Sequence, residues 1–300
     1  MVDTSIYRSE AENQWCPGCS NFAVLNALKR ALIVLDRDPH QVCLVSGIGQ
    51  AAKLPHYLEA NFFNGLHGRA IPAATGISFA NPKLTTVVTT GDGDFYGEGG
   101  NHFLHALRRN PNITVIVHDN RIYALTKGQA SPTTPIGTHT RLQFSGVEAQ
   151  PIQGLATAIA HRAPFVGRGF AGDIEGLTDL IIQAISTRGF SLVEVVQPCI
   201  TWGEHGKNWK PWWEDRLASL PSGYDPHNQI AAMEKTLAND YPLPVGVIYR
   251  GPMREVFGSS YRAAVGDGIV AELPRLARQT VEQRLDKMRW KRVSKDSYDL

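Results

Sequence analysis

The chain alternates short runs of β-branched residues with segments in which apolar residues recur at helical spacing. The β-branched runs predict strands at 41–47, 84–90, 113–119 and 190–198. The amphipathic segments predict helices at 21–35, 100–110 and 173–187. Most of the strands are apolar almost throughout, as strands covered on both faces are. The pattern therefore predicts an α/β fold, with a mostly parallel sheet and helices on both faces.

The character of the chain changes at about residue 203. Trp, Pro and charged residues dominate the stretch WGEHGKNWKPWWEDR, and the last forty residues have the pattern of a polar helix. We therefore divide the chain into a domain of residues 1–202 and a C-terminal extension of residues 203–300. We expect the extension to cover the sheet or to pack against a neighbouring subunit.

Composition and charge narrow the class of protein. Among 300 residues, 43% are apolar and the net charge is +2, which gives no electrostatic reason to expect a nucleic-acid or anionic membrane partner. The first fifteen residues lack the apolar core of a signal peptide, and no apolar run approaches the roughly 18 residues that span a membrane. We expect a cytoplasmic protein whose four cysteines are thiols or metal ligands rather than disulfides.

The loop TTGDGDFYGEGGN, residues 89–101, places two aspartates among five glycines directly after a predicted strand. Three familiar interpretations fail on spacing. The loop has no Gly-Lys-Ser/Thr ending for a P-loop, and Tyr96 stands where a dinucleotide fingerprint needs glycine. A calcium loop starting at Asp92 would need an oxygen ligand at Tyr96 and a glutamate at Phe103.

A strand-turn-helix-strand interpretation of this segment predicts a different site. It places Asp92 and Asn120 at the carboxyl ends of parallel neighbouring strands, where α/β proteins bind ligands. A carboxylate, an amide oxygen and a nearby backbone carbonyl suit Mg²⁺. Glycines in the loop and a helix starting near Gly100 would bring backbone N–H groups close to phosphate oxygens. We therefore expect Mg²⁺ and a diphosphate here, in preference to a turn with solvated aspartates.

Gly-Asp-Gly followed by an asparagine 28 residues after the aspartate resembles the signature of thiamine diphosphate enzymes. With its flanking motifs, the chain is similar to the β subunit of 2-oxoacid:ferredoxin oxidoreductases. The similarity runs from about residue 12 to 202 and, more weakly, through 243–250. Its motifs are WCPGC (15–19), SGIG (46–49), GLHGRAIPAATG (65–76), GDGD with GGNHF, and HDNRIYALTKGQASPTT (118–134).

The resemblance implies the diphosphate-binding domain of a thiamine diphosphate enzyme and a set of site residues. Asp92, Asn120 and the carbonyl of Ile122 would bind Mg²⁺, and the diphosphate would be lined by Gly91, Gly93 and Asp94. His67 would approach the cofactor or serve as a structural histidine. Lys53 and Lys127 would steady the 2-oxoacid carboxylate or the cofactor, or would be ordinary exposed lysines.

The same resemblance implies oxidative decarboxylation of a 2-oxoacid, with coenzyme A as acyl acceptor and ferredoxin or flavodoxin as electron acceptor. We identify only one cofactor-binding domain, so the pyrimidine-binding domain and its glutamate would come from a separate α subunit. The expected assembly is an (αβ)₂ heteromer that is active only when both chains are present. The substrate stays open, with 2-oxoglutarate or pyruvate preferred on prevalence.

The cysteines fit the family's [4Fe-4S] site incompletely. Cys16, Cys19 and Cys199 match three cluster ligands, but Gln50 stands directly after SGIG, where the family has its remaining cysteine. Cys43 lies inside a predicted strand, where a buried structural thiol is the favoured role. We therefore expect a cluster on three cysteines with an unidentified fourth ligand. A labile or three-iron cluster, a lost metal, and a zinc site using His56 remain alternatives.

Two rival functions remain open. Gln50 favours a thiamine diphosphate-dependent decarboxylase or acyl transferase without a cluster, whereas the three retained cysteines disfavour it. A non-catalytic subunit whose CPGC segment binds zinc would leave Asp92 and Asn120 unexplained.

Overall fold

The computed structural model describes residues 3–203, 206–237 and 241–265. One compact unit runs to Ser260, and a second begins at Tyr261. The predicted polar helix of the last forty residues lies outside the described residues, except that helix α8 covers Ser259–Val265. Across the described residues, no helix has the length and apolar character needed to cross a membrane.

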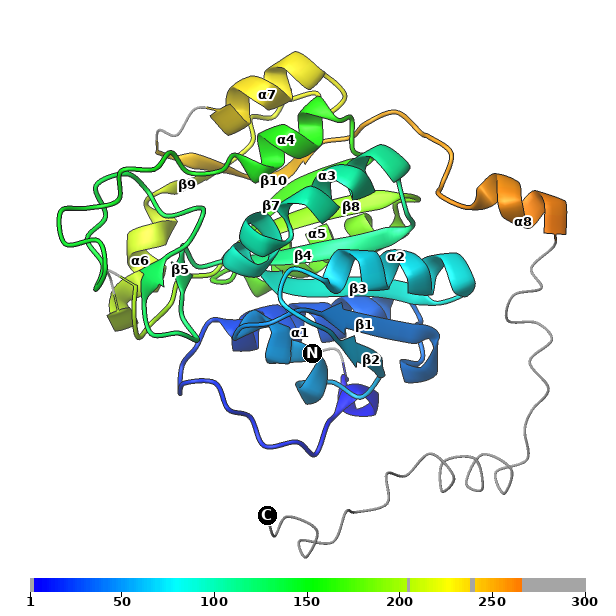
Figure 1. Ribbon diagram of the computed structural model, residues 1–300, viewed down its shortest axis with the longest axis horizontal. Coiled ribbons are helices and arrows are strands. Elements are labelled where there is room, and N and C mark those ends of the chain that lie inside the picture. Colours follow the sequence, from blue (N-terminus) through cyan, green and yellow to red (C-terminus); the bar gives the residue numbers. More distant parts are fainter. Residues whose placement is uncertain (1–2, 204–205, 238–240, 266–300) are drawn as a thin grey trace, which may run out of the picture. The chain divides into compact units, whose positions relative to one another are not determined.

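The first unit is built on an eight-stranded sheet (Figure 1). Its strands lie in the order β2 (Asn61–Asn64), β1 (Val42–Ser46), β3 (Thr85–Gly91), β4 (Ile113–Asp119), β8 (Phe190–Val196), β7 (Phe165–Phe170), β10 (Leu243–Tyr249) and β9 (Leu217–Ser219). Strands β2 to β7 in that order are all parallel, whereas β10 runs antiparallel to β7. The predicted mostly parallel sheet is confirmed.

Helices cover both faces of this sheet, as predicted (Figure 1). One face packs against α2 (Ala70–Ala80), α3 (Gly100–Arg109) and α4 (Gly154–Ala160), and α7 (Gln229–Leu237) lies on α4. The other face packs against α1 (Asn21–Val34) and α5 (Ile174–Ser186). Alternate strand residues feed the two cores: Val42 and Leu44 face α1, and Cys43 and Val45 face α2.

Short elements complete the unit. Among the residues that the structure describes, the helical turns are η1 (Ser5–Tyr7), η2 (Pro39–Gln41), η3 (Ala51–Tyr57), the π-helical η4 (Gly93–Glu98) and η5 (Gly206–Asn208). The short helix α6 spans Trp209–Glu214, and β5 (Ile122–Tyr123) pairs with β6 (Gln129–Ala130) in a separate ribbon. Residues after 203 therefore join the main sheet through β9 and β10 as well as packing beside it.

The predicted elements match the observed ones within about two residues, whereas β2, β7, β9, β10, α2, α4 and α7 were not predicted. Strand β7, FVGRGF, was missed because a charged residue and two glycines interrupt its apolar pattern. At both glycines a Cβ would lie close to a core leucine, 2.8 Å from Leu180 Cδ1 at Gly167 and 2.6 Å from Leu177 Cδ1 at Gly169, so any larger residue would force that side chain to move.

The segment after β3 differs in one respect from its prediction. Helix α3 begins at Gly100 as expected, but the π-helical turn η4 precedes it without a break. The N–H of Gly99 already donates to the carbonyl of Asp94. The first N–H groups of η4 therefore lie beside Asp92, in addition to those at the start of α3.

Candidate active site

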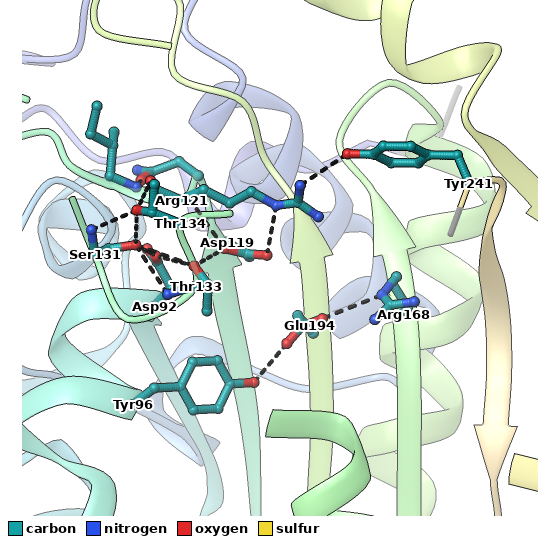
Figure 2. Close-up of polar contacts among 12 residues, drawn as sticks. Asp92, Tyr96, Asp119, Arg121, Ser131, Thr133, Thr134, Arg168, Glu194 and Tyr241 are labelled. Atoms are coloured by element: carbon teal, nitrogen blue, oxygen red, sulfur yellow. Dashed lines mark hydrogen bonds and ion pairs between the residues drawn. The ribbon is translucent and has the colours of Figure 1, made fainter. Parts of the chain in front are cut away.

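Asp92 lies at the carboxyl edge of β3, where the sequence predicts it. Its side chain is buried, and its Oδ2 accepts hydrogen bonds from the hydroxyls of Ser131 and Thr133 (Figure 2). Strand β3 pairs with β4 so that Gly91 lies opposite His118; Asp92, directly after β3, and Asp119, the last residue of β4, therefore lie at the same edge of the sheet. The right-handed parallel crossover brings these two chain segments to one edge.

A second carboxylate, Asp119, lies beside Asp92 at this edge and was given no role from the sequence. The hydroxyl of Thr133 is 2.6 Å from Asp92 Oδ2 and 2.7 Å from Asp119 Oδ1 (Figure 2). Burial raises the pKa of both carboxyls, and the neighbouring Asp92 charge further raises the pKa of Asp119. Two buried carboxylates at one edge of the sheet form a site that favours a cation, which fits Mg²⁺.

Asn120 and Ile122 form the turn that follows β4. The Asn120 Oδ1 accepts the backbone N–H of Ile122 at 2.9 Å, and Arg121 between them has a left-handed backbone with φ 59°. The structure thus places all three predicted magnesium ligands at one edge of the sheet. In this structure the Asn120 side-chain oxygen accepts a hydrogen bond from the turn that contains Asn120.

Asp94 is held by protein groups on every side. Its Oδ1 accepts the N–H groups of Ile48 (3.1 Å) and Gly68 (2.7 Å), and its Oδ2 accepts the Thr90 hydroxyl at 2.7 Å. His67 Nδ1 lies 2.7 Å from the same Oδ1. The carboxylate therefore joins the loop after β1, the segment before α2 and the end of β3, which makes it a positioning group for the loops around Asp92.

His67 and Gly68 fix the segment before α2 against the π-helical turn. Gly68 has φ 68°, and a Cβ there would lie 2.4 Å from the carbonyl carbon of Glu98. Only glycine tolerates both the left-handed backbone and this close approach. The His67 Nδ1 also lies 3.5 Å from Glu98 Oε2, so the ring is anchored by two carboxylates. The His67 side chain is nevertheless 40% exposed.

The two loop glycines predicted to line the diphosphate differ in surroundings. At Gly93 a Cβ would lie 2.3 Å from the Tyr123 ring, so protein packing alone requires glycine there. At Gly91 a Cβ would meet only the methyl of Ala51, at 3.9 Å. The backbone of Gly91 is therefore the more open of the two to an approaching phosphate.

The candidate lysines lie on two separate segments. Lys53 is half-buried on η3, and Lys127 is exposed in the turn between β5 and β6 with φ 78°. No hydrogen bond or ion pair joins either ammonium group to another of the residues that the structure describes. Both charges thus remain available to an anionic ligand.

Three of the four free cysteines line one cavity of about 50 Å³, the cysteine cavity, together with Gln50, Asn120 and Trp202. Burial, with smaller contributions from Cys199 and Cys16, raises the pKa of Cys19 to about 11. Backbone and hydroxyl donors already point at sulfur: the Trp202 N–H lies 3.4 Å from Cys199 Sγ, and the Thr201 hydroxyl 3.3 Å from Cys16 Sγ.

This donor set fits an iron–sulfur cluster. A metal centre draws cysteine thiols into their thiolate form, and N–H···S bonds are contacts by which proteins tune cluster potentials. Cys43 is buried in β1 and does not line the cysteine cavity, which confirms its expected structural position. His56 is exposed, packs on Phe62 and is likewise not among the lining residues. Among the described residues, no three His, Cys, Asp or Glu side chains converge to hold a single metal ion.

A buried polar network beyond Asp119 was not found from the sequence. Arg168 of β7 and Glu194 of β8 are direct cross-strand partners, with Arg168 Nε 3.3 Å from Glu194 Oε1 (Figure 2). The Tyr96 hydroxyl donates to Glu194 Oε2 at 2.8 Å. The pKa of Tyr96 is raised, mainly by burial and next by the Glu194 charge. Arg168 and Glu194, with Arg121 and Tyr241, line a cavity of about 310 Å³ beside Asp119.

The fold and the Asp92 edge together define a thiamine diphosphate-binding domain. Residues 42–195 match the family model "Thiamine pyrophosphate enzyme, C-terminal TPP binding domain", and residues 199–264 match the model for the C-terminal part of the pyruvate ferredoxin oxidoreductase β subunit. The chain belongs to the β subunits of 2-oxoacid:ferredoxin oxidoreductases. It is therefore part of an oxidoreductase that acts with an α subunit.

Individual relatives support this assignment. The chain is 38% identical over 262 residues to 2-oxoacid:ferredoxin oxidoreductase 2, subunit beta, of Aeropyrum pernix, with 84% of each chain covered. It is 42% identical over 193 residues to 2-oxoglutarate oxidoreductase subunit KorB of Mycobacterium tuberculosis, covering 64% of this chain and 52% of that one. A solved 2-oxoglutarate:ferredoxin oxidoreductase from Magnetococcus marinus superposes with a TM-score of 0.84 at 29% identity, covering 97% of both chains.

Proposed function

We propose that this chain, with its α subunit, converts a 2-oxoacid, coenzyme A and oxidised ferredoxin or flavodoxin into an acyl-CoA, CO₂ and reduced carrier. The single observation that carries the proposal is the Asp92–Asn120 edge, with the cysteine cavity sharing Asn120 as a wall. A cofactor site and an electron-transfer site would thus be adjacent at one end of the sheet. The free thiols favour a reducing compartment, so we place the complex in the cytoplasm. We expect the complex to be an (αβ)₂ heteromer.

The chain's contribution to the reaction is binding and positioning. When bound, thiamine diphosphate supplies the nucleophilic carbon and electron sink for decarboxylation. Asp92, Asn120 and the Ile122 carbonyl would hold Mg²⁺, and Gly91 would admit a phosphate oxygen. Asp94 fixes the surrounding loops. The hydroxyl groups that donate to Asp92 set the orientation of the Asp92 carboxylate. A glutamate from the α subunit would act on the pyrimidine ring.

Substrate and electrons would use the remaining predicted residues. Lys53 and Lys127 would attract the 2-oxoacid carboxylate, because neither ammonium is neutralised by another described residue. A cluster held by Cys16, Cys19 and Cys199 would supply one-electron transfer to the carrier protein. The names of the relatives favour 2-oxoglutarate over pyruvate as the substrate.

The test uses the chain expressed together with its α subunit and purified without oxygen. We expect 2-oxoglutarate- and coenzyme A-dependent reduction of ferredoxin, with a higher kcat/KM than for pyruvate. Asp92→Ala should abolish both activity and thiamine diphosphate retention, since the metal loses its charged ligand. Asp179→Ala, at an exposed position on α5, is the matched control and should change neither. An active Asp92→Ala complex with normal cofactor content would contradict the site.

Three further variants, with two controls, test the lysines and the thiols. Lys53→Met and Lys127→Met should raise KM for the 2-oxoacid more than they lower kcat, whereas Lys83→Met at an exposed site should not. Cys16→Ser should remove the cluster signal while thiamine diphosphate stays bound, and Cys43→Ala should leave the signal unchanged. Identical signals in the two cysteine variants would show that Cys16 is not a ligand.

A further inference from the structure

Gln50 lines the cysteine cavity, and its side chain carries an unused acceptor. Its Oε1 is buried and has no hydrogen-bond partner, and no hydrogen bond joins its carboxamide to any other described residue. Leaving a buried carbonyl oxygen without a donor is unfavourable, so such a group points to a missing partner. Gln50 lines this cavity together with the sulfur-bearing residues Cys16, Cys19 and Cys199.

The backbone of Gln50 is fixed relative to the first of these cysteines. The indole N–H of Trp15 donates to the Gln50 carbonyl at 2.9 Å, and Trp15 directly precedes Cys16. The Trp15 ring also packs edge-on against Tyr57 at the end of η3, the helical turn that follows Gln50. The position of the carboxamide beside the thiols is therefore set by the fold rather than by its own hydrogen bonds.

A second glutamine, Gln197, lines the same cavity and serves as an internal comparison. Its Oε1 is also buried without a partner, but its Nε2 donates to the Ser20 hydroxyl, which donates in turn to the Pro198 carbonyl. That chain of bonds joins the end of β8 to the start of α1. The carboxamide of Gln197 is thus already engaged in packing, whereas that of Gln50 is not.

We propose that Gln50 is the fourth protein ligand of the cluster and that it binds iron through Oε1. The inference rests on the cluster assigned to Cys16, Cys19 and Cys199 in the proposed function. A carboxamide oxygen is a harder ligand than a thiolate and carries no charge. One iron would therefore be held less tightly than the other three, and the cluster would carry one negative charge fewer than a cluster with four thiolates. Both effects follow from this one residue.

The consequences are a labile iron and a raised reduction potential, because net cluster charge is one of the determinants of potential. In the oxygen-free complex, about four irons per β chain are expected, as in other clusters of this type. Brief treatment with ferricyanide should remove one iron and produce the EPR signal of a three-iron cluster. Gln50→Cys should keep all its iron under the same treatment and should have a lower midpoint potential.

The experiment compares wild type with Gln50→Cys, Gln50→Ala and Gln197→Met, each expressed together with the α subunit. The readouts are iron and sulfide per chain, EPR after ferricyanide and after dithionite, and the midpoint potential. Gln50→Ala should lack one iron as isolated, and Gln197→Met should resemble wild type. All variants should retain thiamine diphosphate, which serves as the check on folding.

Two results would overturn the proposal in different ways. If Gln50→Ala matched wild type in iron, EPR and potential, or if Gln197→Met alone lost iron, the ligand assignment would be wrong while the cluster stood. If the oxygen-free wild-type complex contained thiamine diphosphate but no iron, the cluster of the proposed function would fall and the ligand with it.

Discussion

Asp92, which follows β3, and Asp119, which ends β4, share a single hydroxyl group. Thr133 Oγ1 lies 2.6 Å from one carboxylate and 2.7 Å from the other, yet it carries one proton. It can donate to only one of the two oxygens, so the other contact needs a proton on the facing carboxyl. Burial raises the pKa of both groups, which is consistent with one proton retained by the pair near neutral pH.

Magnesium binding should therefore release a proton. The cation favours the ionised form of Asp92. The apparent affinity of the site for Mg²⁺ should therefore rise with pH, up to the pH at which Asp92 and Asp119 are both ionised without metal. We expect release of about one proton per site at about pH 6.5 and less at higher pH. Calorimetric titration of the complex with Mg²⁺, in two buffers of different ionisation enthalpy, measures this number. Heats that do not depend on the buffer would contradict it.

Thr133→Val removes the shared hydroxyl and keeps the shape of the side chain. We expect the Mg²⁺ affinity to fall by roughly 10-fold to 100-fold, because groups that orient a metal ligand have effects of that size. Thr157→Val on α4, whose hydroxyl donates to a backbone carbonyl away from this edge, is the matched control. An equal loss of affinity in both variants would point to general destabilisation.

The buried pair Arg168 and Glu194 should be strongly coupled. Arg168→Met would leave Glu194 charged and buried, with the Tyr96 hydroxyl as its remaining side-chain donor, and should lower the free energy of unfolding by about 3–5 kcal/mol. The double variant Arg168→Met/Glu194→Leu should lose less than the sum of the single variants, since neither charge remains. Urea unfolding followed by tryptophan fluorescence gives these values.

The exposed pair Lys210 and Glu214, 3.7 Å apart, is the control, and Lys210→Met should lower the free energy of unfolding by less than about 1 kcal/mol.

His118 should make the fold sensitive to mild acid. Its Nδ1 lies 2.7 Å from Asn21 Oδ1, its Nε2 is buried without a partner, and burial lowers its pKa to about 3. The unfolded chain binds a proton at about pH 6.5 and the folded chain does not, so stability is complete above that pH and falls below it. Between pH 7 and 5 this residue should remove about 2 kcal/mol from the free energy of unfolding. His118→Gln should abolish that part of the pH dependence; unchanged dependence in urea unfolding would contradict it.

Parallel β topology explains why part of the site could be predicted. Asp92 and Asn120 each follow a strong β-branched run, and parallel neighbours end at the same edge whatever lies between them. Ser131 and Thr133 were missed because they reach Asp92 only after the ribbon β5–β6 folds back, a path that local patterns do not specify. The motif ASPTT contains both residues, and its run of hydroxyls was the available signal.

The Arg168–Glu194 pair was missed for a different reason. Glu194 stands in a recognised strand, where a lone charged residue among apolar ones is a signal of a buried partner. That partner lies on β7, whose glycines hide it from pattern analysis, although Leu177 and Leu180 fill the space that the glycines leave. The cross-strand register that joins the two residues depends on the whole sheet order, which no local segment encodes.

Asp94 should be essential for the site without touching the metal. In Asp94→Asn one carboxylate oxygen becomes an NH₂ group, which must face donors from either Thr90 or the Ile48 and Gly68 N–H groups. We expect a loss of about 1–3 kcal/mol in unfolding free energy and weaker thiamine diphosphate binding, although the metal ligand Asp92 is still present.

Gly47→Ala should act in the same direction, because a Cβ there would lie 2.1 Å from Asp94 Oδ2. Gly76→Ala on α2 has nothing within 4 Å and should be neutral or slightly stabilising. Urea unfolding and calorimetric cofactor titration of the complex measure both effects, and normal cofactor affinity in Asp94→Asn and Gly47→Ala would remove Asp94 from its positioning role.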